Sequence, residues 1–304
     1  MREITIATVQ FKPKMGEPED NLVKMSDFVS KIASQQKVDL IIFPELATSG
    51  NELGVRFTEV AQRIPGPSVN LMAQRAAEYG VYIAFGLCTK ERVESVIFNS
   101  AVLVGPDGEL LGNYNKVHLR GEERMAFREG FKYPVIETEI GNIGLLLGWD
   151  LAFPEAARSL ALEGAELLCV MANWETPQID EYKTYVKARA LENAVFVAAS
   201  NRVGEDVTVN YGGESMIVGP RGKVHAALTL EKKAAEKGEK AEKPAGEAAT
   251  ETPAAPPPAP AKTEPSEGYA VARIDLDEVR KFREEFQHIQ TRQPLTYRAI
   301  VKRY

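Results

Sequence analysis

The sequence predicts an α/β fold. Short runs of apolar residues, many of them β-branched, alternate along the chain with longer stretches that resemble helices. With 304 residues and 44% hydrophobic content, the chain can bury one substantial core or two modest ones. Its net charge of −6 is mild for this length and argues against a general nucleic-acid surface.

Seven strands and four helices are expected in order along the chain. The first strand has alternating side chains and begins at residue 4, and the last helix carries residues 182, 185, 189 and 192 on one face or its edge. Gly-Pro-x-Gly tetrapeptides at 105–108 and 219–222 predict turns, each between two strand-like runs. The expected strands are 4–10, 40–43, 82–87, 100–104, 143–147, 167–171 and 196–200, and the expected helices are 21–35, 68–79, 154–163 and 180–193.

One segment departs from this pattern. Residues 231–268 contain no Val, Ile, Leu, Met or aromatic residue, so they cannot bury enough apolar surface to offset the entropy of ordering. We therefore expect a disordered insertion at the tip of a β-hairpin formed by strands 223–230 and 269–274. The alternative is a linker to a separate C-terminal domain. Residues 269–304 are too few for an independent core, which favours a single domain over 1–304.

The sequence also indicates a cellular location. The strand pattern starts without a preceding apolar targeting segment, and the apolar runs are too short to span a bilayer. Two cysteines cannot form a disulfide framework, which indicates a reducing compartment. We expect a soluble, cytoplasmic protein.

Four positions draw attention as candidates for chemistry. Glu45 follows a buried strand, Lys116 follows the predicted hairpin at 99–111, and Glu123 lies a few residues further on. Taken singly, each is a charged side chain whose default place is a solvated surface. Gly148 lies at a sharp turn between a buried strand and a helix start, in the segment 144–155.

Taken together, Glu45, Lys116, Glu123 and the turn at Gly148 resemble the nitrilase superfamily of carbon–nitrogen hydrolases. The resemblance covers residues 4–228 and resumes over 269–297, and it includes Asn173-Trp174. It implies a four-layer αββα sandwich and no cofactor or metal, and the three scattered histidines, His118, His225 and His288, do not suggest a metal site either. The sequence Trp149-Asp150 is similar to the amidase and N-carbamoyl amidase branches, where nitrilases have Trp-Glu.

The resemblance also implies a role for each of these residues. In the family a cysteine thiolate attacks an amide or nitrile carbon and forms a covalent intermediate that water later hydrolyses. Glu45 corresponds to the general base, and Lys116 to the cation that steadies the carbonyl oxygen together with the Trp149 N–H. Glu123 corresponds to the residue that orients the lysine, which should stay charged between two carboxylates.

The residue at the position of the nucleophile is Gly148, which has no side chain. Cys169 lies within a predicted strand and Cys88 follows the end of another; both are expected to be buried, so neither replaces the thiol. Glycine tolerates the strained backbone of such a turn, so the fold should survive while turnover falls by a factor on the order of 10⁶. We expect Asp150 to cap the helix that follows.

Three functions remain open. The first is an inactive relative that binds a small amide, carbamoyl compound or carboxylate. The second is an active amidase or N-carbamoyl amidase whose position 148 has been altered. The third is a non-catalytic subunit of a hetero-oligomer. Asn173 is a substrate-binding candidate, and Trp174 either walls the pocket or fills the core. Loops 50–56, 121–131 and 175–179 are expected to set ligand identity.

An assembly is expected as well. The family resemblance implies a homodimer or a higher oligomer formed through the helices at 154–163 and 182–193. The C-terminal stretch 292–304 is too apolar for a free tail and is expected to pack on the partner. No nucleic-acid or membrane partner is expected.

Overall fold

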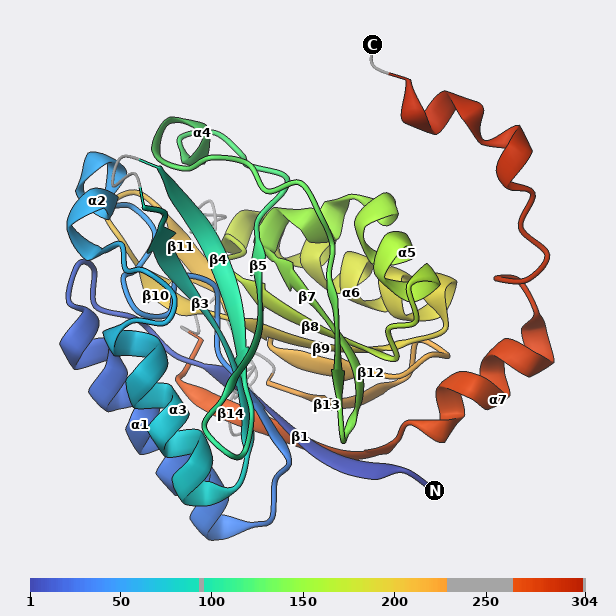
Figure 1. Ribbon diagram of the computed structural model, residues 1–304, viewed down its shortest axis with the longest axis horizontal. Helices are drawn as coiled ribbons and strands as arrows, with labels where there is room; N and C mark the ends of the chain where they lie inside the picture. Colours follow the sequence, from blue (N-terminus) through green and yellow to red (C-terminus); the bar gives the residue numbers. More distant parts are fainter. Residues whose placement is uncertain (93–95, 229–264, 303–304) are drawn as a thin grey trace, which may run out of the picture.

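The computed structural model describes residues 1–92, 96–228 and 265–302. Two six-stranded sheets stack face to face, and helices cover the outer face of each (Figure 1). This is the four-layer αββα sandwich that the sequence predicts. Each of the seven predicted strands and four predicted helices is present, with bounds within three residues of those expected.

The first sheet has the strand order β14-β1-β2-β3-β4-β5. Strands β1, β2 and β3 run parallel, whereas β14 and β4 pair antiparallel to their neighbours and β5 pairs antiparallel to β4. The predicted turn at 105–108 connects β4 to β5. The strands are β1 (Glu3–Gln10), β2 (Leu40–Ile42), β3 (Tyr82–Lys90), β4 (Ile97–Val104), β5 (Leu110–Asn115) and β14 (Gly268–Asp275).

The second sheet has the strand order β13-β12-β9-β8-β7-β6. Its central strands β7, β8 and β9 are parallel, and the predicted turn at 219–222 joins the antiparallel pair β12 and β13. A separate two-stranded ribbon, β10 and β11, lies outside both sheets. The strands are β6 (Val135–Thr138), β7 (Gly141–Leu147), β8 (Leu167–Ala172), β9 (Phe196–Asn201), β10 (Val203–Glu205), β11 (Asn210–Gly212), β12 (Met216–Val218) and β13 (Val224–Ala227).

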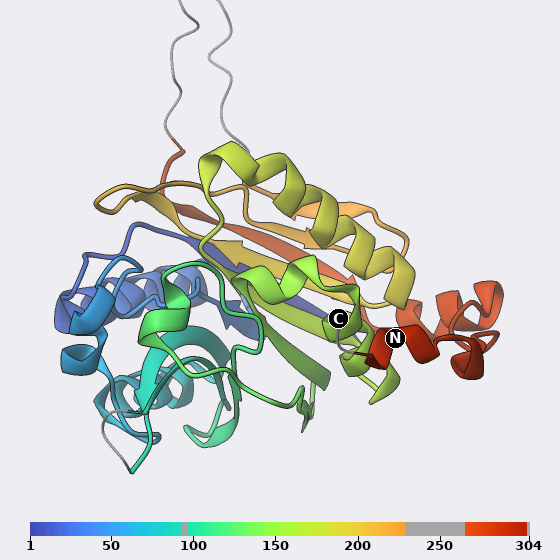
Figure 2. The ribbon, with the colours of Figure 1, turned by 90° about the horizontal axis from the view of Figure 1, so that it is seen from above.

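The helices divide between the two outer layers. Helices α1 (Pro18–Gln35) and α3 (Pro67–Tyr79) bury their apolar stripes against the first sheet, and α5 (Pro154–Leu162) and α6 (Ile179–Asn193) do so against the second (Figure 2). Proline at the first helical position starts α1, α3 and α5, where its missing N–H costs no hydrogen bond. The remaining helices are α2 (Phe57–Val60), α4 (Glu123–Ala126) and α7 (Asp277–Phe286).

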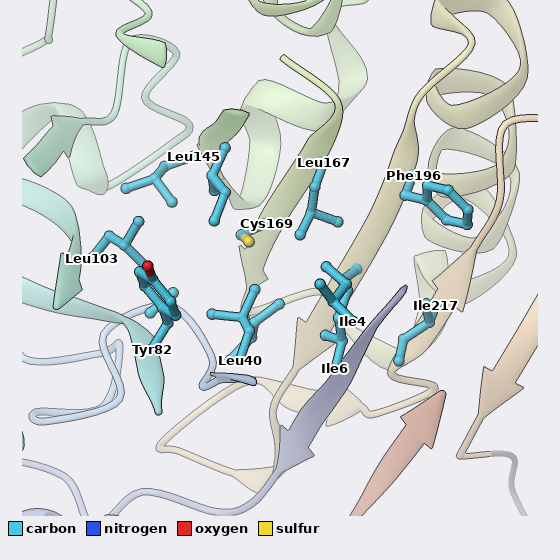
Figure 3. Close-up of a cluster of buried hydrophobic side chains, with 14 of the residues drawn as sticks. Ile4, Ile6, Leu40, Tyr82, Leu103, Leu145, Leu167, Cys169, Phe196 and Ile217 are labelled. Carbon is cyan, nitrogen blue, oxygen red and sulfur yellow. The ribbon is translucent and has the colours of Figure 1, made fainter. Parts of the chain in front are cut away.

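The main core fills the space between the sheets (Figure 3). It combines Ile6 and Leu40 of the first sheet with Leu145, Leu167 and Cys169 of the second, all at most 1% exposed. Because each sheet is covered on both faces, its central strands are apolar along their whole length rather than alternating. This packing fixes the ends of the strands, from which the loops of the candidate site emerge.

The predicted hairpin between strands 223–230 and 269–274 is wrong. Strand β13 pairs with β12 at the edge of the second sheet, whereas β14 pairs over eight residues with β1 in the first. Both strands have the expected strand pattern, but a long connection places no constraint on which edge the second strand joins. Of the expected insertion at 231–268, residues 231–264 lie outside the described residues.

The C-terminal stretch after α7 runs apart from the two sheets (Figure 1). Of its apolar side chains, Leu295 is 81% exposed and Val301 is 87% exposed. Among the described helices, none has both the length and the apolar character needed to cross a membrane.

Candidate active site

A cavity of about 260 Å³ opens where several strands end at the same edge of the sandwich. Glu45 lies beyond β2, Gly148 directly follows β7, and Asn173 directly follows β8. The carboxyl ends of parallel strands are a common place for ligand sites in α/β folds. The cavity brings together every site residue expected from the sequence: Glu45, Lys116, Glu123, Gly148, Trp149, Asn173 and Trp174.

Lys116 forms the centre of a buried ion cluster. Its Nζ donates to Glu45 Oε1 at 2.7 Å and to the two carboxylate oxygens of Glu123 at 2.7 and 2.9 Å. Lys116 directly follows β5, and Glu123 begins the short helix α4. The side chains of Lys116 and Glu45 are only 4% and 2% exposed, so the cluster is shielded from water.

Asn99, part of a segment that matches the family, completes this cluster, a role that the sequence alone does not assign to it. It lies on β4, and its Nδ2 donates to Glu45 Oε1 at 2.7 Å and to Glu123 Oε1 at 3.2 Å. Its backbone carbonyl accepts the N–H of Lys116 at 2.9 Å. Asn99 therefore holds both carboxylates and the lysine in place. An uncharged residue within a strand gives no sequence signal for such a role.

The electrostatics of the cluster follow from its burial. Burial alone lowers the pKa of Lys116, but attraction and hydrogen bonds from Glu123 and Glu45 outweigh it, so the pKa lies above its ordinary value. Burial raises the pKa of Glu45, and the nearby Glu123 raises it further, although Lys116 opposes both effects. The lysine is thus held as an ammonium, as the sequence predicts.

Gly148 adopts the left-handed backbone that the elbow requires. Its φ is +39°, and it opens the 3₁₀ helix Gly148–Ala152 immediately after β7. A Cβ atom built at this position overlaps Glu45 Oε2 and lies 3.0 Å from Glu45 Cδ. Asn99 and Lys116 both bind Oε1, so Oε2 is the oxygen directed toward position 148. The carboxylate of Glu45 therefore occupies space that any side chain at 148 would need.

The expectation for Asp150 is wrong. Its carboxylate does not cap α5, which starts after Phe153 without a side-chain cap. Instead, the buried carboxylate accepts the Tyr114 hydroxyl at 2.6 Å and the His118 N–H at 2.9 Å, and it contacts His118 Nδ1 at 2.8 Å. Asp150 lies within the 3₁₀ helix and points back to the segment that carries Lys116, so it links that segment to the elbow.

A second buried side chain holds the elbow from the other side. Arg189 of α6 donates through Nε to the carbonyl of Leu151 at 2.9 Å and through Nη2 to the carbonyl of Ala152 at 3.0 Å. Glu192 accepts from Arg189 Nη1 at 2.8 Å. The guanidinium therefore satisfies carbonyls that a short 3₁₀ helix leaves without partners.

The opposite wall of the cavity is built from loops. Asn51 donates through Nδ2 to the Tyr211 hydroxyl at 3.0 Å, and the Glu52 carboxylate accepts the N–H groups of Thr208 and Val209 at 2.8 and 3.2 Å. These bonds fasten the loop after residue 50 to the β10–β11 ribbon.

Trp174 takes both of the roles left open by the sequence. It is 5% exposed and packs with Tyr182 and Tyr185 at ring-centroid distances of 5.8 Å, yet it also lines the cavity.

The two cysteines lie away from the cavity, as expected. Cys88 lies within β3 and Cys169 within β8, both are free and buried, and neither lines the cavity. Burial raises the pKa of both thiols well above the ordinary value, so both stay protonated.

An αββα sandwich with these charged residues at one edge defines a carbon–nitrogen hydrolase type of protein. The family model for carbon-nitrogen hydrolases matches residues 5–235, and the chain belongs to this family. It is 45% identical over 230 residues to a probable nitrilase from Schizosaccharomyces pombe, covering 75% of this chain and 85% of the relative. It is 30% identical over 224 residues to a 2-oxoglutaramate amidase from Bacillus subtilis, covering 73% and 85% respectively.

A solved structure shares the same fold. An amidase from Nesterenkonia sp. AN1 superposes with a TM-score of 0.76 over 97% of this chain and 96% of that chain, at 22% identity. That structure carries the acetamide moiety of fluoroacetamide added covalently at its active-site cysteine.

Proposed function

We propose that this amidase-like member of the carbon–nitrogen hydrolase family binds a small amide or carbamoyl compound without covalent turnover. The observation that carries the proposal is Gly148, which stands at the elbow with the carboxylate of Glu45 against it. The ammonium and the two carboxylates remain in place around it. The groups that can bind an amide are therefore present, whereas the attacking atom is absent and the Glu45 carboxylate occupies its space.

The retained groups suit the recognition of an amide. A ligand carbonyl oxygen is placed to accept from Lys116 Nζ and from the N–H of Trp149, which begins a helical turn and has no partner within it. The amide nitrogen can donate to Glu45 or Glu123. Because the cluster is buried, these hydrogen bonds form in a low-dielectric setting where charged partners count for more than in water.

Covalent catalysis lacks a nucleophile in this pocket. Removing the nucleophile of a serine hydrolase lowers turnover by about 10⁶-fold, and no cysteine of this chain lies at the cavity to replace it. Cys88 and Cys169 are both enclosed by strands. Hydrolysis at a measurable rate is therefore not expected from the chain as written.

The test combines binding with chemistry. Titration calorimetry of the wild-type chain against primary amides and N-carbamoyl compounds should give saturable heats, while ammonia release stays at background and the intact mass stays unchanged. A Lys116→Met variant should lose the heats. Ammonia release or a ligand adduct from the wild-type chain would overturn the proposal, and so would a flat titration with every compound.

A Gly148→Cys variant separates the proposal from the alternative that position 148 has been altered in an active amidase. In that alternative, the variant hydrolyses small amides. Our proposal expects little gain, because the new side chain must first displace the Glu45 carboxylate. Substantial ammonia release from the variant, with the wild-type chain inert, shows that only the thiol is missing and favours the alternative.

We further propose that the protein is a cytoplasmic homodimer. Leu162 of α5 and Leu191 of α6 are 47% and 48% exposed, and Ile300 in the C-terminal stretch is 59% exposed. Exposed apolar residues on neighbouring helices and an extended segment favour an interface. Size-exclusion chromatography should give a dimer for the full chain and a monomer after truncation before Arg292. A monomeric full chain excludes the homodimer and leaves the subunit of a hetero-oligomer as the candidate.

A further inference from the structure

The charges that line the cavity are unevenly distributed. Two of the lining residues are cationic, Lys116 and Arg120, whereas five are acidic: Glu45, Glu52, Glu122, Glu123 and Glu175. Even with Glu45 carrying a proton, acidic groups remain in excess. A cavity of about 260 Å³ with such a lining favours ligands that bring positive charge.

Three of the acidic groups already have hydrogen-bond or ion-pair partners within the protein. Glu45 and Glu123 share the ammonium of Lys116. Burial disfavours the charge of Glu52, but hydrogen bonds from Thr208 and Val209 outweigh burial and lower its pKa, so this carboxylate is ionised and held in the wall.

The carboxylates of Glu175 and Glu122 differ from these three. Within residues 1–92, 96–228 and 265–302, neither carboxylate makes a hydrogen bond or an ion pair. Glu122 is exposed, whereas Glu175 is half-buried. The backbone of Glu175 is fixed by a β-bridge to Tyr211, so its side chain starts from a rigid part of the wall. The carboxylate of Glu175 is therefore available to pair with a positively charged group of a ligand in the cavity.

The aromatic lining points the same way. Trp149 and Trp174 both line the cavity, and aromatic faces attract cations. The guanidinium of Arg120, which is exposed, already lies over the Trp149 ring at 5.4 Å from its centroid. Trp174 also carries a buried Nε1–H that has no acceptor among the described residues; as a donor it suits an acceptor atom of the ligand and does not itself favour a cation.

We propose that the pocket selects amides that carry a positive charge at the end remote from the amide, and that Glu175 is the counter-charge. This inference rests on the proposed binding function. The amide group then lies at Lys116 and Glu45, and the cationic end lies at the wall formed by Glu175 and Trp174. Glu175 is a specificity-determining residue in this account and takes no part in chemistry.

The test uses three matched probes on the full chain: hexanamide, its counterpart with an ammonium in place of the terminal methyl group, and its counterpart with a carboxylate there. We expect the ammonium probe to bind about threefold to fivefold more tightly than hexanamide, as one partly exposed ion pair provides. The carboxylate probe should bind most weakly. The preference for the ammonium should shrink as salt is added.

Two charge-neutralising variants locate the effect. Glu175→Gln should remove most of the ammonium preference while leaving the affinity for hexanamide nearly unchanged. Glu163→Gln removes the same charge from an exposed residue that does not line the cavity, and it should leave the preference intact. If both variants reduce the preference equally, the effect comes from net charge and the assignment of Glu175 is wrong.

The outcomes distinguish this inference from the function on which it rests. If hexanamide binds but the ammonium probe binds no better, the cavity still binds amides and only the charge selection is wrong. If the carboxylate probe binds best, Arg120 is the selecting residue, and the inference is again overturned. If none of the three probes binds, both the inference and the proposed binding function fail.

Discussion

Gly148→Ala tests how tightly the candidate site is packed around its missing side chain. The variant adds a single methyl group at a position where the backbone has a φ of +39° and where Glu45 Oε2 fills the space. The left-handed backbone costs an alanine about 1 kcal/mol relative to glycine. Displacing the Glu45 carboxylate weakens a hydrogen bond to a buried ammonium, which costs about 1.5–3 kcal/mol. The expected loss of stability is roughly 2.5–4 kcal/mol.

Gly80→Ala is the matched control for this change. Gly80 caps α3 with a φ of +64°, and no heavy atom lies within 4 Å of the position its Cβ would take. The control therefore contains the backbone cost alone, about 1 kcal/mol. The difference between the two variants measures the conflict with Glu45.

Urea unfolding of the two variants, analysed with equal m-values, supplies the free energies. A double-mutant cycle then tests whether Glu45 causes the difference in unfolding free energy. In a Glu45→Ala background, Gly148→Ala should lower the unfolding free energy no more than Gly80→Ala does. If Gly148→Ala is already as mild as Gly80→Ala in the wild-type background, Glu45 does not fill the space beside position 148. That result would refute the inference that a side chain at position 148 cannot coexist with the observed position of Glu45.

Two further predictions concern the charges of the cluster. Lys116→Met leaves two carboxylates without the ammonium between them and should cost about 3–5 kcal/mol in urea unfolding at neutral pH, whereas Lys132→Met, at an exposed lysine, should stay within about 0.5 kcal/mol of wild type. A small loss for Lys116→Met contradicts the buried ion cluster. Because burial raises the pKa of Glu45 above its usual value of 4.5, its contribution to stability is full below that pH and declines as the pH rises through the folded pKa. Wild-type stability relative to Glu45→Gln should therefore fall from about pH 4.5 toward neutrality, and a pH-independent difference between the two contradicts the raised pKa.

The elements of the fold were predictable where local pattern decides them. Strands such as β8 are continuous apolar runs, and helices such as α5 begin at a proline, so both can be found without knowing the tertiary structure. The partner of β14 could not be found in this way. A strand of suitable pattern fits several sheet edges, and only the packing of the complete sandwich pairs β14 with β1 rather than with β13.

Some residues of the candidate site could likewise be predicted from the sequence, and others could not. The resemblance to the carbon–nitrogen hydrolases implied that Glu45, Lys116 and Glu123 share one site, and all three line the same cavity. The roles of Asn99 and Asp150 depend on which side chains face each other across loops and strands. Asp150 stands near a helix start in the sequence, but it lies within reach of Tyr114 and His118 only in three dimensions.

The bonds of Asp150 have a consequence for how such pockets can diversify. Asp150 holds the lysine-bearing segment and the elbow together, so those two parts of the cavity form one braced unit. In grafting experiments, Asp150 should be exchanged only as a block with Tyr114 and His118. The loop around Asn51 and Glu52 is instead fastened to the β10–β11 ribbon, so it can be exchanged between relatives independently of Asp150. New binding preferences are therefore most readily engineered on that side of the cavity.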